Sequence, residues 1–220
     1  MGAKGELAKT APEARLLRLR DPARSGNESC AHDDPVRWGL PGRRSQGEAG
    51  SEEDHARRLT LVAVISDTHL PRGARRLPPK CFANLQRAEV ILHAGDFVEA
   101  GVLAELSALG PLEAVSGNMD DDELKQLLPR RRVVQVGEAR IGMTHEPGQS
   151  QGRAQRLAGW FEDCDAVVYG HTHQPEVTRR DDLWIFNPGS PTERRRAPTH
   201  TMLLLEVAGR TIVPKLVDLT

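Results

Sequence analysis

The chain has 220 residues, of which 38% are hydrophobic and 28% charged, and its formal net charge is -1. This near-neutral balance gives no overall electrostatic reason to expect nucleic acid or an anionic membrane as a partner. The three cysteines, Cys30, Cys81 and Cys164, argue against a disulfide framework, and no apolar run approaches the roughly 18 to 20 residues that span a bilayer, so we expect a cytoplasmic protein.

Residues 1–57 differ in composition from the rest, because glycine, proline and charges of both signs are spread through them. Only Ala11 to Arg20 could form a short helix, and its leucines are too few to bury a face. We predict a disordered leader over 1–57 and one domain over 58–220. A transit peptide is disfavoured by the scattered acids, and a start codon assigned too far upstream would give the same pattern.

From Leu59 onward, short β-rich runs alternate with helical stretches. The first apolar run lies within 61–69 and ends in Asp67 and His69. Helical spacing predicts helices over 80–88, 97–109, 121–128 and 151–161. Strand patterns cover 90–92, 112–115, 132–136, 139–144, 166–169, 176–180, 183–186, 201–207 and 211–217.

The order of these elements predicts the architecture. Strand, helix, strand in the first half implies parallel crossovers, and the strands from residue 176 onward read as an antiparallel run. Two sheets packed face to face with helices outside would bury all of the apolar runs, and about 160 residues can supply such a core.

Seven potential metal ligands lie at or just past the end of a predicted strand. Two cations about 3.5 to 4 Å apart need roughly four protein ligands each, with one carboxylate shared, and seven residues with one bridge fit that number. Cysteine is absent from the set, so a structural thiolate zinc site is not supported. The seven are Asp67, His69, Asp96, Asn118, His145, His171 and His173.

This series of motifs resembles the signature of the calcineurin-like metallophosphoesterases, and Asn187-Pro-Gly-Ser190 resembles the small prokaryotic phosphodiesterases among them. The resemblance covers about 59–219 and implies an α/β fold, a four-layer α/β/β/α sandwich of two mixed β-sheets flanked by helices. It also implies two divalent metal ions, which we expect to be manganese, with iron, zinc or nickel as alternatives. Carried over by position, the first metal is held by Asp67, His69 and His173, the second by Asn118, His145 and His171, and Asp96 bridges them.

Such a centre would hydrolyse a small-molecule phosphodiester with a metal-bound hydroxide, and Asp96 and Asn118 are its expected catalytic residues. Asn118 could also direct its amide N–H at the phosphate. Larger phosphatases of the family usually carry a His after this Asn, where it is thought to protonate the leaving group. Here the residue is Met119, which has no proton to give and favours diesters over monoesters. Asp120 is expected to orient a ligand or cap a helix.

Four other features carry open alternatives. His93 either orients a ligand or is structural, and Glu146 either narrows the site or faces solvent. The residues 187–190 first of all form a tight turn. Arg194, in the run 194–196, is a candidate substrate-binding residue or part of a solvated face.

The sequence leaves three alternatives to a phosphodiesterase, namely a phosphomonoesterase, a protein phosphatase and a non-catalytic scaffold. A phosphomonoesterase or protein phosphatase is disfavoured by Met119. A non-catalytic scaffold on the same fold is disfavoured because every ligand position is filled. A homo-oligomer is compatible with the sequence.

Overall fold

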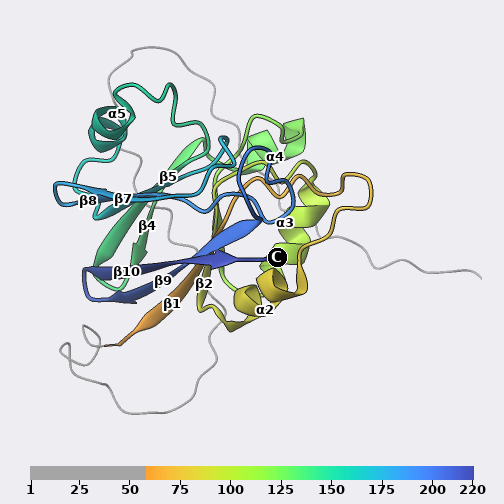
Figure 1. The fold of residues 1–220 in the computed structure, drawn as a ribbon, viewed down its shortest axis with the longest axis horizontal. Coiled ribbons are helices and arrows are strands. Elements are labelled where there is room, and N and C mark those ends of the chain that lie inside the picture. The colour runs from red at the N-terminus through yellow and green to blue at the C-terminus, as the bar shows by residue number, and fades with distance from the viewer. Residues whose placement is uncertain (1–57) are drawn as a thin grey trace, which may run out of the picture. The chain divides into compact units, whose positions relative to one another are not determined.

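Residues 58–220 are the part of the chain that the computed structural model describes (Figure 1). The leader predicted over 1–57 lies outside the described residues. Two β-α-β units come first, formed by β1 (Thr60–Ile65), α2 (Pro79–Arg87), β2 (Val90–His93), α3 (Ala100–Ser107) and β3 (Leu112–Ala114). After them come α4 (Asp122–Leu127), β4 (Arg131–Val136), β5 (Ala139–Thr144), α5 (Arg153–Trp160), β6 (Ala166–Tyr169), β7 (Glu176–Arg180), β8 (Leu183–Asn187), β9 (Thr201–Ala208) and β10 (Thr211–Asp218).

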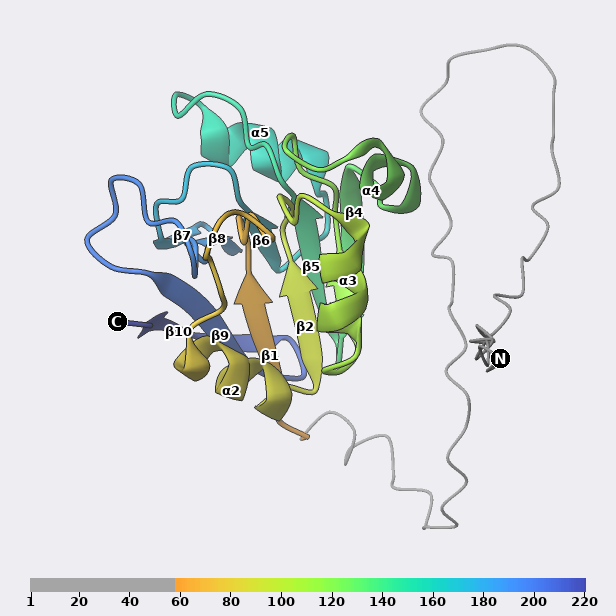
Figure 2. The same cartoon turned by 90° about the vertical axis from the view of Figure 1, so that its right-hand side faces the viewer.

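The first sheet has the strand order β10-β9-β1-β2-β3. Its three sequential strands are parallel, with Val62 opposite Val90 and Ile91 opposite Leu112, as the predicted crossovers require. Figure 2 shows β1 and β2 side by side with their arrowheads at the same edge. The loops that follow these strands therefore leave the sheet together.

The second sheet has the order β4-β5-β6-β8-β7. The hairpin β4-β5 turns at Gly137, whose φ is 58°, a conformation that glycine adopts without steric cost. Strands β5, β6 and β8 are parallel to one another. This sheet thus also gathers the carboxyl ends of three strands at one edge.

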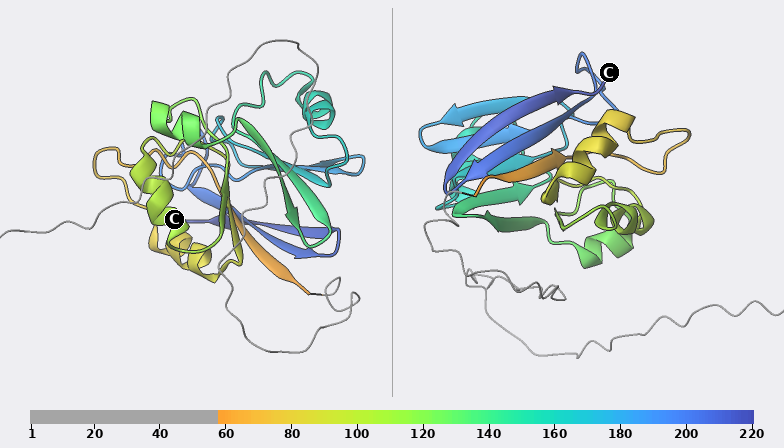
Figure 3. Two further views of the ribbon diagram at one scale, coloured as in Figure 1. Left: turned by 180° about the vertical axis from the view of Figure 1, so that it is seen from behind. Right: turned by 90° about the horizontal axis from the view of Figure 1, so that it is seen from below.

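The last four strands do not form one antiparallel run, so that part of the prediction is wrong. Strand β8 pairs antiparallel with β7 but parallel with β6, whereas β9 and β10 return to the first sheet beside β1; Figure 3 shows β9 and β10 together in dark blue. The reason lies in β9, which buries Met202 on one face and Leu203 on the other. A strand that is apolar on both faces suits the interior of either sheet, and its sequence does not say which.

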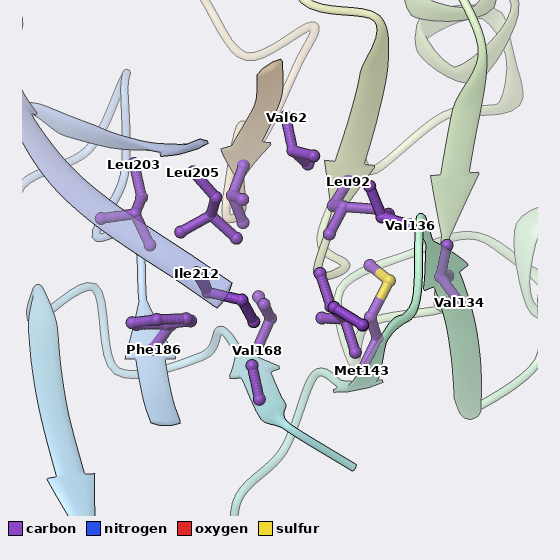
Figure 4. Close-up of a cluster of buried hydrophobic side chains, with 14 of the residues drawn as sticks. Val62, Leu92, Val134, Val136, Met143, Val168, Phe186, Leu203, Leu205 and Ile212 are labelled. Atoms are coloured by element: carbon purple, nitrogen blue, oxygen red, sulfur yellow. The ribbon is translucent and has the colours of Figure 1, made fainter. Parts of the chain in front are cut away.

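Three hydrophobic layers hold the sandwich together. The central layer lies between the sheets and joins Val62 and Leu92 to Met143, Val168 and Phe186 (Figure 4). An outer layer packs α2, α3 and α4 on the first sheet, and another packs α5 on the second. Figure 1 shows these helices on opposite sides of the strands. The fold is the expected four-layer α/β/β/α sandwich.

Helix boundaries differ from the sequence patterns mainly at α3. The prediction began at Phe97, but the helix begins at Ala100. Asp96 and Val98 both have positive φ, and Phe97 is fully buried in the outer layer, so these residues form a turn that cannot be helical. Among the helices of residues 58–220, none combines the length and the apolar character that a membrane crossing needs.

Candidate metal centre

The seven predicted ligands come together where the carboxyl edges of the two sheets meet. Each follows a parallel strand: Asp67 and His69 follow β1, Asp96 follows β2 and Asn118 follows β3. From the second sheet, His145 follows β5, and His171 and His173 follow β6. The two sheets touch directly here, because the backbone N–H of His171 donates to Asp67 Oδ2 at 3.0 Å.

The first group consists of Asp67, His69 and His173. Their ligand atoms lie within 4.8 Å of one another, and all three residues are fully buried. His173 Nε2 is 3.1 Å from Asp67 Oδ1 and 3.3 Å from His69 Nε2. One oxygen and two nitrogens thus converge on a single point.

The second group consists of Asn118, His145 and His171. Asn118 Oδ1 lies 3.0 Å from His145 Nε2 and 2.8 Å from His171 Nδ1. Asn118 is exposed and His171 half-buried, whereas His145 is buried. The centre is therefore open to solvent on the side of Asn118 and His171.

Asp96 lies between the two groups. Its Oδ2 is 3.6 Å from His69 Nε2 and 3.3 Å from His145 Nε2, and the carboxylate is nearly fully buried. The other oxygen, Oδ1, accepts a hydrogen bond from the backbone N–H of Met119 at 2.7 Å. Asp67 also approaches the second group, since its ligand atom lies within 4.8 Å of those of Asp96 and His145.

Backbone strain is concentrated at these residues. Five of the seven have positive φ, although none is glycine: Asp67, His69, Asp96, His171 and His173, with φ between 45° and 67°. Such left-handed residues cost of order 1 to 3 kcal/mol each and persist only where the surroundings impose them. The strain turns the chain sharply after each strand and aims the side chains inward.

Two glycines permit this close approach. A Cβ on Gly117 would lie 2.1 Å from Asp96 Oδ1 and 2.2 Å from the Asp96 nitrogen. A Cβ on Gly170 would lie 2.0 Å from Ser66 Oγ and 2.8 Å from the carbonyl oxygen of Ala94. The glycines before Asn118 and His171 are therefore required by packing, because any side chain would push the two ligand loops apart.

Hydrogen bonds to the protein fix the orientation of two imidazoles. His145 Nδ1 faces the carbonyl oxygen of Ala94 at 2.7 Å, and His173 Nδ1 faces that of Glu193. Because a carbonyl oxygen can only accept, each Nδ1 carries the proton, which leaves the Nε2 lone pair free for a cation. The Oγ of Ser66 donates to Asp67 Oδ2 at 2.6 Å and orients that carboxylate.

Charges within the centre shift the pKa values of its members. Burial raises the pKa of Asp96, but the hydrogen bond and charge of His145 outweigh it and lower the pKa to about 2. Burial lowers the pKa of His145, but the hydrogen bond to Asp96 and the carboxylate charges raise it to about 9. Without a cation, a proton on His145 thus balances Asp96, and a divalent cation would replace that proton.

The donor set fits divalent cations. Ligands held at about 2.0 to 2.2 Å from one cation lie roughly 3 Å from each other, which is the spacing of His173 and Asp67 and of His145 and Asn118. Imidazole, carboxylate and amide donors suit manganese, iron, zinc or nickel, and cysteine takes no part.

His93 and Asp120 are buried and contact the loops that carry the ligands. His93 is fully buried, accepts from the Gly95 N–H at Nδ1 and faces Thr68 Oγ1 at 3.1 Å, so it braces the two loops that carry Asp67 and Asp96. Burial lowers its pKa to about 3, which keeps the ring neutral. Asp120 accepts from the backbone N–H groups of Gly117 and Val98 and leaves helix capping to Asp121.

Glu146 and Met119 are exposed, whereas residues 187–190 contact the ligand loops. Glu146 is exposed and pairs loosely with Arg130, and Met119 is 40% exposed beside Asn118. Asn187 donates to the carbonyl of Gly170, and Ser190 Oγ donates to that of Asp67. The residues 187–190 therefore do more than turn, because they tie both ligand loops of the first group together.

Arg194 and Arg195 make different contacts. Arg194 donates to the carbonyls of Ala197 and Pro198 in its own loop, whereas Arg195 is the residue that contacts His171, through the carbonyl oxygen at 3.4 Å. Sequence reasoning also missed Glu193, whose carboxylate approaches His69, and Arg75, which pairs with Glu193. Neither residue belongs to one of the predicted motifs, so only their proximity in the fold reveals them.

The sequence and the fold of this chain are similar to those of known proteins. Residues 61–210 match the model of the calcineurin-like phosphoesterase superfamily domain. A probable metallophosphoesterase of Methanothermobacter thermautotrophicus is 38% identical over 146 residues, which are 66% of this chain and 84% of the relative. A phosphodiesterase of Methanocaldococcus jannaschii is 28% identical over 142 residues, 58% of this chain and 82% of that protein. The solved structure of vacuolar protein sorting 29 from Cryptosporidium parvum gives a TM-score of 0.65 at 27% identity, covering 74% of this chain and 92% of that one.

Proposed function

The chain belongs to the calcineurin-like phosphoesterase superfamily and is a metal-dependent phosphoesterase; from this premise we propose that it hydrolyses phosphodiester bonds with two divalent cations. The observation that carries the proposal is the position of Asp96, whose Oδ2 lies within 3.6 Å of His69 Nε2 and 3.3 Å of His145 Nε2. One carboxylate between two ligand groups is the arrangement that a dinuclear centre needs.

Asp67, His69 and His173 would hold the first cation and Asn118, His145 and His171 the second, with Asp96 shared. When bound, the two cations make hydroxide available at neutral pH and stabilise the charge that develops on the phosphate oxygens. We propose manganese as the cellular metal, within a set of donors that also suits iron, zinc and nickel.

The protein's own residues position the substrate. Asn118 turns Oδ1 toward His145 and His171, so its Nδ2 lies on the opposite side of the amide and can donate to a phosphate oxygen. Asn118 is exposed at the open side of the centre, where a substrate can enter. Its neighbour Met119 has no proton for a leaving group, and this favours diesters whose leaving groups depart without one.

The proposal also covers the extent of the catalytic domain and the location of the protein in the cell. Residues 58–220 would form the catalytic domain, since all the layers and ligands described above lie within them. The odd, separated cysteines support a reducing cytoplasmic location, and a homo-oligomer is compatible with the chain. A scaffold function is the second candidate, and its support is the likeness to vacuolar protein sorting 29.

Turnover of model esters tests the proposal. Protein stripped with EDTA and reloaded with manganese should hydrolyse bis-p-nitrophenyl phosphate, and should hydrolyse the monoester p-nitrophenyl phosphate much more slowly. Stoichiometric metal analysis should find two cations per chain. Binding of two cations without turnover of any ester would favour the scaffold, and faster turnover of the monoester would favour a phosphomonoesterase.

A further inference from the structure

A carboxylate that none of the predicted ligand motifs contains stands beside the first ligand group. Glu193 Oε2 lies 3.9 Å from His69 Nε2 and 3.1 Å from Arg75 Nη1, and its Oε1 lies 4.0 Å from Arg195 Nε. Arg75 belongs to the loop after His69, and Arg195 to the loop after β8. Two guanidinium groups from separate loops thus flank one anionic group at the edge of the centre.

The ion pair between Arg75 and Glu193 is close but poorly aligned. The atoms Arg75 Nη1 and Glu193 Oε2 are buried, yet neither makes a hydrogen bond of proper geometry with any group of residues 58–220. Buried polar atoms are normally satisfied, because an unsatisfied one costs free energy. Arg75 Nη1 can therefore still donate a hydrogen bond to a group that takes the place of the Glu193 carboxylate.

The surroundings of Glu193 are positive. Its carboxylate lies 3.1 Å from Arg75 Nη1 through Oε2 and 4.0 Å from Arg195 Nε through Oε1. Glu193 is also the sole acid in the two loops 70–78 and 188–200. These loops carry six arginines, namely Arg72, Arg75, Arg76, Arg194, Arg195 and Arg196. Such an environment stabilises an anion of higher charge than a carboxylate.

We propose that Arg75 and Arg195 form an anion subsite for a second phosphate group of the substrate, and that Glu193 is the internal occupant which that group displaces. The inference rests on the proposed phosphodiesterase function and narrows its substrates to phosphodiesters that carry a further phosphate monoester. A phosphate monoester has a charge of about -1.5 to -2 at pH 7 and three acceptor oxygens. It can bind both guanidinium groups, whereas the carboxylate of Glu193 leaves Arg75 Nη1 without a well-aligned hydrogen bond.

Two matched substrates test the subsite. Thymidine 5′-(p-nitrophenyl phosphate) is compared with the same compound carrying a 3′-phosphate, so that the leaving group is identical. The ratio of kcat/KM for the 3′-phosphorylated substrate to kcat/KM for the parent compound should be at least about ten, which is the gain that charge-assisted hydrogen bonds give. In Arg75→Ala and in Arg195→Ala the ratio should fall toward one. The control Arg196→Ala, at an exposed position in the same run, should keep the ratio.

Binding without catalysis gives the second readout. Thymidine 3′,5′-bisphosphate is titrated calorimetrically into metal-free protein in EDTA. Glu193→Gln should tighten this binding severalfold, because the competing charge is gone, and the two arginine variants should weaken it. Weaker binding by Glu193→Gln, or a substrate ratio of one in the unaltered protein, would show that the ion pair only braces the loops. If no ester is hydrolysed with any metal, the proposed function fails, but the calorimetric comparison still decides the subsite.

Discussion

The two oxygens of the Asp96 carboxylate make different contacts. Oδ2 faces His69 and His145, and Oδ1 accepts the backbone N–H of Met119. This last bond holds the loop that carries Asn118 against the loop that carries Asp96. The residue therefore joins the two ligand groups both through its charge and through the backbone.

Replacing Asp96 by Asn should remove most of the activity. The amide keeps the shape but loses the negative charge that two cations would share, so we expect turnover to fall by more than about 100-fold and the affinity for both metals to weaken. Metal content by mass spectrometry and hydrolysis of bis-p-nitrophenyl phosphate measure the two effects. Glu105→Gln, on the exposed face of α3, is the charge-matched control. Near-normal turnover in Asp96→Asn would refute the shared-carboxylate assignment.

Met119 has no proton that it could give to a leaving group. Its side chain is 40% exposed at the mouth of the centre, directly after Asn118. Met119→His would place an imidazole there, and a well-positioned general acid is typically worth about 10²- to 10⁴-fold. We expect the gain on monoesters and poor leaving groups, with little change on aryl diesters.

The slope of log rate against leaving-group pKa measures this effect. The unaltered protein should show a steep slope, and Met119→His a shallower one. A flat slope in the unaltered protein would mean that another group already donates the proton. Met119 would then not be the determinant of diester preference.

At the scale of the elements, a buried polar side chain braces the loop that carries Asn118. Asp120 is the brace of the loop after β3: its Oδ2 accepts from Gly117 N at 2.6 Å and its Oδ1 from Val98 N at 2.9 Å. The side chain is almost fully buried. It thereby fixes the turn in which Gly117 touches Asp96 and Asn118 faces His145.

Asp120→Asn should therefore destabilise the fold and loosen the second ligand group. The amide would direct an N–H at a backbone N–H, so one buried donor loses its acceptor, at a cost of about 1 to 3 kcal/mol. Urea unfolding measures this loss, and metal titration should show a weaker second site. Asp122→Asn, exposed in the first turn of α4, should stay within about 1 kcal/mol. Equal losses in both variants would contradict a bracing role for Asp120.

Most elements could be predicted because their patterns are local. The apolar runs before Asp67, Asp96 and His145 have a strand pattern that does not depend on which strands they pair with. The ligand residue types at the ends of these runs can be read from the sequence. Glu193 and Arg75 could not be found in this way, since they meet only in the folded chain. The choice between Arg194 and Arg195 likewise depends on the loop conformation, in which Arg195 has a φ of 47°.

At the largest scale, residues 58–220 form a sandwich whose two sheets meet at the central apolar layer and again at the ligand residues. Residues 58–220 supply the seven proposed ligands, and the composition of residues 1–57 predicts no packed face. We therefore expect a protein that begins at residue 58 to fold and to turn over bis-p-nitrophenyl phosphate as the full chain does. Thermal unfolding and steady-state kinetics compare the two. A large fall in the unfolding midpoint of the shorter protein would show that residues 1–57 stabilise the domain.

Metal binding should stabilise the whole sandwich, because each proposed cation would draw ligands from both sheets. The first group joins Asp67 and His69 from the loop after β1 to His173 after β6, and the second joins Asn118 after β3 to His145 and His171. Unfolding separates these residues, so a cation binds the folded chain in preference to the unfolded one. At a free concentration 100 times its Kd, one such cation adds about 2.7 kcal/mol to the free energy of unfolding.

For a domain of this size, that gain should raise the Tm by roughly 5 to 10 °C. Manganese added to EDTA-stripped protein should produce the rise, and magnesium, which prefers oxygen ligands, should produce a smaller one. His173→Ala should lose the part of the rise that comes from the first cation, while Glu105→Gln should keep all of it. An unchanged Tm at saturating manganese would mean that manganese does not bind the folded chain in preference to the unfolded one, and the assignment of these residues as its ligands would then be wrong.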